Sequence, residues 1–186
     1  MLTVRTFIST FLVLVCYLSI SACTPKFDWR EVRMNDAPIT LLMPGKPASH
    51  AREVDLNGLK VQMQMTAVDV HQISFALAYA KLDLIDPNTR AEISSEQKNQ
   101  KQQFALEAMK QGMLKNIQGT IIENSDASLP KNTIVALGKS QNGQAIKFIG
   151  RFTIQGPWII QAVMIGDEKS FNPDVVDMFF SSLKFN

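Results

Sequence analysis

The chain contains little cysteine and little histidine. Its 186 residues include two Cys and two His. Cys16 lies inside an apolar N-terminal segment and Cys23 ends that segment, so the rest of the chain has no thiol left to pair and its fold cannot depend on a disulfide. Two histidines and no spare thiol also provide few ligands for a zinc centre and few bases to activate a nucleophile. The stability of the fold must therefore come from packing.

The chain also lacks a strong excess of charge of either sign. Nineteen Lys and Arg stand against 17 Asp and Glu, for a net charge of +2. Arg5 is the only charged residue among residues 1–22, so the remainder has 18 cations against 17 anions, a net charge of +1. A chain so close to neutrality gives no electrostatic reason to bind nucleic acid. We expect no nucleic-acid partner.

No apolar run has the length of an ordinary membrane span. The longest covers residues 7–20 and is interrupted by serine and threonine, whereas a helix needs roughly 20 apolar residues to cross hydrocarbon. Arg5 precedes the run, and the small residues Ser21 and Ala22 follow it before Cys23. A cationic start, a short apolar run and small residues at its end are typical of a secretory signal.

The end of this segment, Ile20-Ser21-Ala22-Cys23, resembles the lipobox of bacterial lipoproteins, which has a branched apolar residue, two small residues and a cysteine. The resemblance implies that the Cys23 thiol takes a diacylglycerol, that a peptidase cuts just before it, and that the freed amine is acylated. Residues 1–22 are then the signal peptide and Cys23 is the lipid attachment site. The alternatives are an uncleaved signal anchor and a cleavage at another site.

Residues 23–28 are predicted to be a lipidated tether, and residues 29–186 a single domain. The 164 residues that remain after position 22 (186 minus 22) can bury about two-thirds of their unfolded surface. Phe27 and Trp29 stand next to the tether. They could lie in the membrane interface, but we expect them to pack on the domain.

Short segments of alternating polarity predict an antiparallel sheet of about six to nine strands. The predicted strands cover residues 29–34, 39–43, 48–56, 59–70, 73–82, 120–124, 133–139, 144–155 and 158–166. Reversals are predicted at Asn57-Gly58, His71-Gln72, Asn142-Gly143 and Gly156-Pro157. In strand 59–70 we expect Val61, Met63, Met65 and Ala67 on the buried face, and Gln62, Gln64 and Thr66 on the solvent face.

One long amphipathic helix of about six turns is predicted between the two groups of strands. Ser94 followed by Gln97 fits a capping box at its start, and Gly119 is the predicted stop. The expected buried face is Phe104, Leu106, Ala108, Met109, Met113 and Ile117. The expected solvent face is Lys98, Lys101, Gln102, Lys110 and Lys115.

A short helix is predicted near the C-terminus. Asn172-Pro173-Asp174 caps its start, with proline allowed in the first turn. Its apolar side is Val175, Val176, Phe179 and Phe180, and a terminal strand is predicted at residues 183–185. The fold class is therefore α+β, with a long amphipathic helix and a short C-terminal helix packed on the antiparallel sheet.

The order of these elements resembles the PsbP-like group of small domains, which includes the bacterial lipoproteins DcrB and LpqN. The likeness lies in residues 39–47 (Ile-Thr-Leu-Leu-Met-Pro-Gly-Lys-Pro) and 179–185 (Phe-Phe-Ser-Ser-Leu-Lys-Phe), and its order of elements extends over nearly the whole mature chain. It implies an accessory or binding role without a common catalytic site.

Few residues suggest chemistry. His50 and His71 are expected at the surface or in turns. Three acidic pairs could hold calcium or act as acid and base, but none has the dense oxygen spacing of an EF-hand loop: Asp83 with Asp86, Asp167 with Glu168, and Asp174 with Asp177. No phosphate-binding glycine loop or nucleophile elbow is present in the sequence. We expect no enzyme activity, no metal and no cofactor.

These observations predict a non-enzymatic envelope lipoprotein, anchored through Cys23, whose periplasm-facing domain binds or supports another envelope component. We expect the partner to be an envelope protein. In the lipoprotein family a residue other than Asp after the cysteine favours the outer membrane over the inner one, and Thr24 stands there. The alternative is a small-molecule or lipid carrier that uses the space between sheet and helix. A third hypothesis, a hydrolase, requires a histidine that meets a carboxylate in a cleft.

Replacing Cys23 by Ala should abolish lipidation, because no other side chain nearby is nucleophilic enough to take the lipid. Metabolic labelling with palmitate measures this directly. Cys16→Ala is the matched control and should be labelled like the wild type. Label retained on the Cys23→Ala protein would contradict the assignment.

Overall fold

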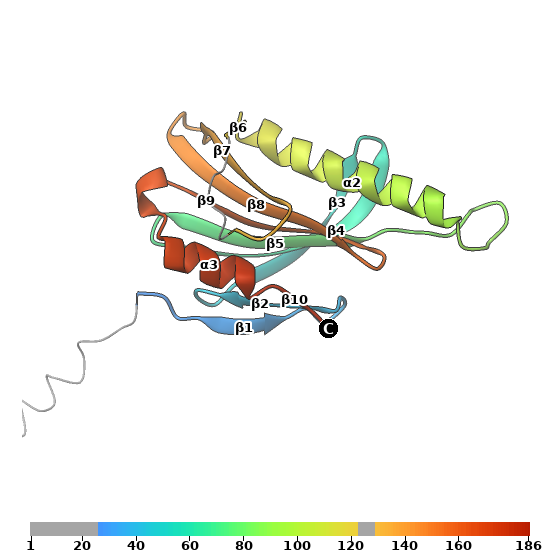
Figure 1. Ribbon diagram of the computed structural model, residues 1–186, viewed down its shortest axis with the longest axis horizontal. Coiled ribbons are helices and arrows are strands. Elements are labelled where there is room, and N and C mark those ends of the chain that lie inside the picture. Colours follow the sequence, from blue (N-terminus) through green and yellow to red (C-terminus); the bar gives the residue numbers. More distant parts are fainter. Residues whose placement is uncertain (1–25, 123–128) are drawn as a thin grey trace, which may run out of the picture.

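The structure is a computed structural model that describes residues 26–122 and 129–186 (Figure 1). The predicted signal peptide, Cys23 and the predicted strand end at residues 123–124 lie outside the described residues. The helices are α2 (Ser95–Asn116), α3 (Pro173–Ser181) and the short 3-10 helix η1 (Glu168–Ser170). The strands are β1 (Arg30–Arg33), β2 (Ile39–Met43), β3 (Ala48–Leu56), β4 (Leu59–Val70), β5 (Ile73–Lys81), β6 (Thr120–Ile122), β7 (Thr133–Lys139), β8 (Ala145–Gln155), β9 (Trp158–Gly166) and β10 (Lys184–Phe185).

The strands form two antiparallel sheets. Seven strands follow the order β3-β4-β5-β9-β8-β7-β6, and three follow the order β1-β2-β10. The predicted α+β class, with a long helix and a short C-terminal helix on an antiparallel sheet, is confirmed. The strands divide between two sheets because Pro44 and Pro47 interrupt the chain after β2, and proline cannot donate to a sheet ladder. The chain therefore starts a new sheet at β3.

The described part of the chain has three layers. Helix α2 lies across one face of the seven-stranded sheet, and α3 and the three-stranded sheet cover the other (Figure 1). Strand β5 supplies both interfaces. Its residues Phe75 and Leu77 belong to the core under α3, whereas Ala78 and Ala80 belong to the core under α2. All four are at most 1% exposed.

The tight reversals on the β3 side of the sheet have the predicted backbone. Asn57 (φ 56°) and Gly58 (φ 92°) are both left-handed, as a type I′ hairpin requires. His71 (φ 49°) and Gln72 (φ 65°) also have positive φ and join β4 to β5. Strands β3, β4 and β5 therefore form the predicted meander.

The predicted two faces of β4 are only partly correct. Val61 and Met63 are buried under α2 as expected. Thr66, expected in solvent, is 3% exposed, and its hydroxyl hydrogen-bonds the Ser49 hydroxyl at 2.8 Å. Further along, Val68 packs on the opposite core. The two faces of β4 are covered at different points along its length, so no single alternation describes the whole strand.

Helix α2 begins and ends with defined caps. The Ser94 hydroxyl accepts from the Gln97 backbone N–H (3.3 Å), and the Gln97 side chain accepts from the Ser94 N–H (3.0 Å), which confirms the capping box. At the other end the Gly119 N–H donates to the Leu114 carbonyl (2.8 Å), as in a Schellman motif. Gln118 (φ 48°), and not Gly119, takes the left-handed conformation of that motif.

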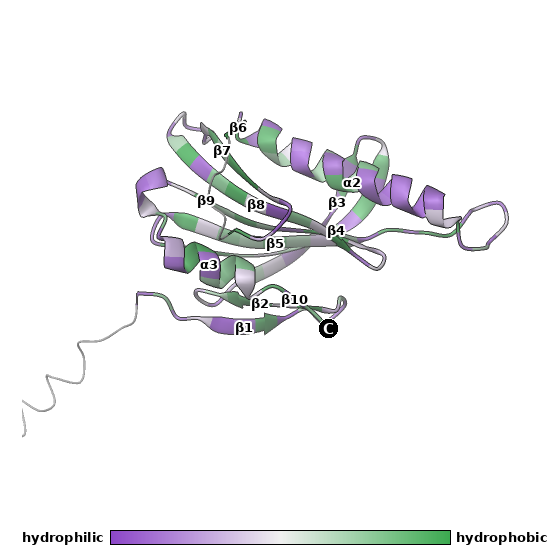
Figure 2. Ribbon diagram, viewed as in Figure 1, coloured by the Kyte–Doolittle hydropathy of each residue, from purple (hydrophilic) through white to green (hydrophobic). Residues whose placement is uncertain are grey.

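The predicted buried face of α2 is wrong at two positions. Phe104 is 49% exposed, and Gln102, expected in solvent, is 3% exposed. The Gln102 amide donates to the Gly156 carbonyl in the β8–β9 turn. Ala105 is fully buried, so the contact stripe includes small residues that let the helix lie close to the sheet. The periodicity of apolar residues does not predict that small residues form the contact, because a hydrophobicity pattern counts Phe as more apolar than Ala. Figure 2 shows polar and apolar residues alternating along α2.

The C-terminal elements agree with the prediction. The Asn172 side chain caps α3 by accepting from the Asp174 N–H at 2.8 Å. All four predicted apolar residues of α3 are buried: Val175, Val176, Phe179 and Phe180. Strand β10 pairs with β2, with Phe185 opposite Ile39. The segments 39–47 and 179–185, which carry the resemblance to the PsbP-like group, therefore meet in one layer.

Two phenylalanines of contrasting environment test the core under α2. Phe148 is fully buried and Phe104 is half exposed. We expect Phe148→Ala to lower the free energy of unfolding by about 3–5 kcal/mol, since it leaves a cavity. Phe104→Ala should change it by no more than about 0.5 kcal/mol. Urea unfolding followed by tryptophan fluorescence measures both, and similar losses in the two variants would contradict this packing of α2.

Candidate functional site

The chain enters the domain through contacts that begin at Lys26. The His71 Nε2 donates to the Lys26 carbonyl oxygen at 2.9 Å. The Phe27 ring lies 5.5 Å from the His71 ring and 6.5 Å from the Phe75 ring, and the Trp29 ring lies 6.3 Å from Phe75. The prediction that Phe27 and Trp29 pack on the domain is confirmed. Residues 26–28, assigned to the tether, also contact the domain surface.

This entry point identifies one end of the molecule. The β4–β5 turn, η1 and the start of α3 lie at the same end (Figure 1). Cys23 is three residues before Lys26, and three extended residues span at most about 11 Å. Any group attached to Cys23 is therefore confined to the neighbourhood of this end.

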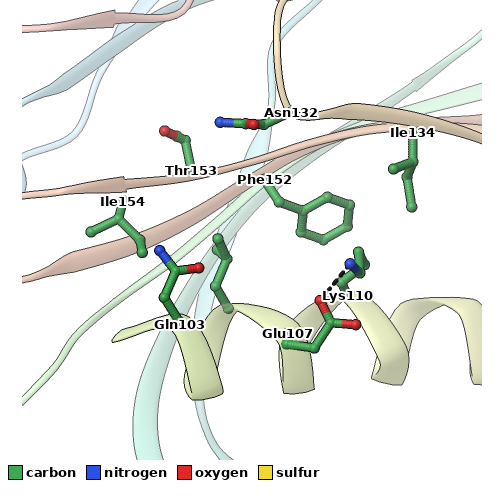
Figure 3. A pocket seen from close by; sticks show the side chains of 9 residues that line it. Gln103, Glu107, Lys110, Asn132, Ile134, Phe152, Thr153 and Ile154 are labelled. Atoms are coloured by element: carbon green, nitrogen blue, oxygen red, sulfur yellow. Dashed lines mark ion pairs between the residues drawn. The ribbon is translucent and has the colours of Figure 1, made fainter. Parts of the chain in front are cut away.

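A cleft of about 410 Å³ lies on the other face of the large sheet, between α2 and strands β7 and β8 (Figure 3). Its apolar residues are Leu106, Ile134, Phe152 and Ile154. Its polar residues are Gln103, Glu107, Lys110, Asn132 and Thr153. An apolar lining with a few convergent polar groups is typical of a small-molecule or peptide site.

The charged groups of the cleft neutralise each other. The Lys110 ammonium forms an ion pair with the Glu107 carboxylate. The pKa of Glu107 is lowered, mainly by the hydrogen bond that Gln111 donates to it at 2.7 Å and then by Lys110. The carboxylate is thus held ionised and is a poor general acid. The cleft offers hydrogen bonds and apolar contacts to a bound molecule.

The two histidines are not brought together. His50 lies on the edge strand β3 opposite Met65, and His71 lies in the β4–β5 turn. Both are exposed. Met65 and His71 are six positions apart in the chain, with five residues of β4 between them, which corresponds to roughly 20 Å along a strand. In the described part of the chain neither histidine forms an ion pair with a carboxylate, so they do not form the arrangement that the hydrolase hypothesis requires.

Four of the six acidic residues in these pairs have a local structural role. Asp83, Asp86 and Asp167 each accept a backbone N–H two residues further along (3.0, 2.7 and 3.1 Å), as turn-forming Asp residues do. Asp174 lies in the first turn of α3, where a negative charge is favourable. Among residues 26–122 and 129–186, no three His, Cys, Asp or Glu side chains are grouped so that they could hold a metal ion.

Tyr79 has a strongly perturbed pKa. Burial raises it, and the Tyr79 hydroxyl, which donates to the Asp36 carboxylate at 2.5 Å, is held protonated further by that bond and charge. Perturbed groups often mark functional sites, but Tyr79 is 4% exposed and packs against Trp158 at 5.8 Å. Because Asp36 lies in the β1–β2 turn, this bond joins the two sheets. We assign Tyr79 a structural role.

Sequence reasoning did not identify the residues that line the cleft or the buried Gln161 next to it. Gln161 is 4% exposed, lies opposite Phe152 in the β8–β9 ladder, and its side-chain oxygen has no hydrogen-bond partner. Asn132 has φ 65°, a conformation in which Asn is enriched. That preference is a weak signal for a turn, and none of these positions carries a sequence signal for a cleft.

The sequence matches no protein-family model, and the search of curated proteins finds no match either. The resemblance to PsbP-like lipoproteins therefore stays a prediction. In the described ranges, no helix combines the length and the apolar character needed to cross a membrane.

The hydrogen bond from Tyr79 to Asp36, which we call the clamp between the two sheets, can be tested with pH. Tyr17 lies in the predicted signal, so Tyr79 is the one tyrosine after position 22. Its folded-state pKa is raised, so its contribution to stability is present below the unfolded pKa of about 10 and is lost as pH rises above it. The Tyr79→Phe variant has no phenol at this position, so its free energy of unfolding should not show this loss above about pH 10. Absorbance titration of the mature protein measures tyrosinate formation, and ordinary titration near pH 10 in the folded state would contradict the clamp.

Proposed function

We propose that the protein is a non-enzymatic lipoprotein of the cell envelope. Cys23 carries the lipid, and the domain faces the periplasm and binds another envelope protein through the cleft between α2 and β8. The observation that carries this proposal is the way the chain enters the domain. Lys26 and Phe27 already contact His71 and Phe75, so Thr24 and Pro25 alone stand between the lipobox cysteine and the packed chain.

Such a short connection supports a domain held against the membrane surface. With at most about 11 Å between Cys23 and Lys26, the domain cannot move far from an acylated Cys23. One acyl chain binds a membrane marginally, whereas two or more hold the protein firmly. Thr24 in place of Asp favours the outer membrane, with the domain on its periplasmic face.

The placement of the cleft supports a binding role. Strand β1, which follows the tether, lies on one side of the large sheet and α2 lies on the other (Figure 1). The sheet therefore separates the cleft from β1 and the tether's entry point. A periplasmic partner could reach the apolar lining and the amides of Gln103 and Asn132 while the lipid anchor stays in the bilayer.

The same cleft favours a second candidate function, a carrier of a small apolar molecule or lipid. Its volume of about 410 Å³ lies in the range of small-molecule sites. Native mass spectrometry of the mature lipoprotein released from detergent separates the two functions. A carrier should retain a ligand of discrete mass, and a partner-binding module should not.

Partner binding can be tested by photo-crosslinking in intact cells. A crosslinking amino acid at Gln103, on the rim of the cleft, should give a discrete adduct with an envelope protein. The same amino acid at Lys115, exposed on the last turn of α2, is the matched control and should not. Equal adducts at both positions, or none at the cleft in cells that lipidate the protein, would contradict binding through this cleft.

A further inference from the structure

A second hollow lies where the chain enters the domain. It has a volume of about 570 Å³ and lies between Lys26, the β4–β5 turn and η1. The residues that matter here are Lys26, His71, Gln72, Lys169, Ser170 and Phe171. Residues distant in the chain thus form one surface at the end of the domain that lies nearest to Cys23.

Of the residues that the structure describes, basic groups line this hollow and no carboxylate does. Lys26 and Lys169 are exposed, and Lys147 lies over the Phe171 ring at 5.5 Å, at the border of the hollow. Within residues 26–122 and 129–186, the ion pairs involve other side chains. Among the described residues, neither the Lys26 nor the Lys169 ammonium group is in an ion pair, so both can meet an anion from outside the chain.

Carboxylates at the same end limit the range of this attraction. Asp69 accepts a hydrogen bond from the Ser74 hydroxyl at 2.5 Å, and Asp167 caps η1. Together with Glu168 and Asp174 they leave this end of the domain close to neutral. The end is thus not a polybasic patch that attracts a membrane over a Debye length. It is suited to one anionic group that enters the hollow.

The turn that forms one wall is held in place. The His71 ring is fixed by its bond to the Lys26 carbonyl, and the Ser170 hydroxyl donates to the Gln72 side-chain oxygen at 3.4 Å. That bond leaves the Gln72 amide N–H groups free to donate. The hollow therefore offers amide and ammonium donors, which together suit the oxygens of a phosphate group.

The length of chain between the anchor and the hollow indicates the occupant. If Cys23 carries a diacylglyceryl group, the glyceryl part lies at the membrane interface, and Lys26 lies within about 11 Å of it. The phosphates of neighbouring phospholipids lie at that depth. We propose that this hollow binds the phosphodiester headgroup of a phospholipid next to the anchor and so sets the orientation of the domain on the bilayer. This inference rests on the proposed lipidation of Cys23.

Hydrogen exchange of the mature lipoprotein tests the site. The protein is placed in maltoside micelles, which contain no phosphate, in the same micelles with inorganic phosphate, and in phosphatidylglycerol vesicles. We expect backbone amides at residues 71–72 and 169–171 to exchange on the order of fivefold more slowly in vesicles, as the contact of about one lysine with an anionic surface would produce. Micelles, with or without inorganic phosphate, should not slow them.

Matched variants identify the groups responsible. Lys26→Gln with Lys169→Gln should remove the slowing in vesicles while the protein stays lipidated and bound. Lys115→Gln with Lys184→Gln removes the same charge from exposed positions on α2 and β10 and should keep it. Unchanged exchange in β5 and β9 confirms that each variant is folded.

The outcomes separate this site from the proposed function. An intact mass with an unmodified Cys23 overturns the lipoprotein assignment and, with it, this site. A modified Cys23 with equal exchange in vesicles and in micelles overturns the headgroup site alone. Slowing by inorganic phosphate in micelles shows a site for free phosphate and also overturns the headgroup assignment, as does slowing that persists in the Lys26→Gln, Lys169→Gln protein.

Discussion

The burial of β5 on both faces is the constraint on which the rest of the structure depends. Phe75 and Leu77 on one face and Ala78 and Ala80 on the other are almost fully inaccessible to solvent. A sheet that is apolar on both sides needs two covering layers. Helix α2 provides one. The other is assembled from the two ends of the described chain, because β1 and β2 lie there together with α3 and β10.

This arrangement has consequences for both candidate sites. Strand β1 belongs to the layer that covers the seven-stranded sheet, so the residues just before β1 also contact the domain. Phe27 packs beside Phe75 for this reason. Lys26, where the described chain begins, and the hollow lined by His71 and Lys169 therefore share one end of the molecule. On the opposite face, α2 approaches the sheet closely through small residues such as Ala105. The cleft lies along the side of that contact, where Gln103 and Lys110 face β7 and β8.

The elements themselves were predictable because their signals are local. The Asn57-Gly58 hairpin, the Ser94 capping box and the Asn172 cap each depend on residues a few positions apart, and backbone sterics decide them. The errors arose where burial depends on distant parts of the chain. Phe104 fits a helical stripe but lies outside the contact between α2 and the sheet, and Thr66 is buried because the covering layer changes along β4.

The sequence by itself determined the class of fold, most element boundaries, the absence of any disulfide after Cys23, and a charge balance too even to favour nucleic acid. Only the tertiary structure decided that the strands form two sheets, that a cleft opens beside α2, and that Lys26, His71 and Lys169 meet in one hollow. The physical reason is the range of the interactions. Turns and caps act between neighbours in the chain, whereas a cleft or a charged hollow needs groups from distant segments, whose meeting leaves no periodic mark in the sequence.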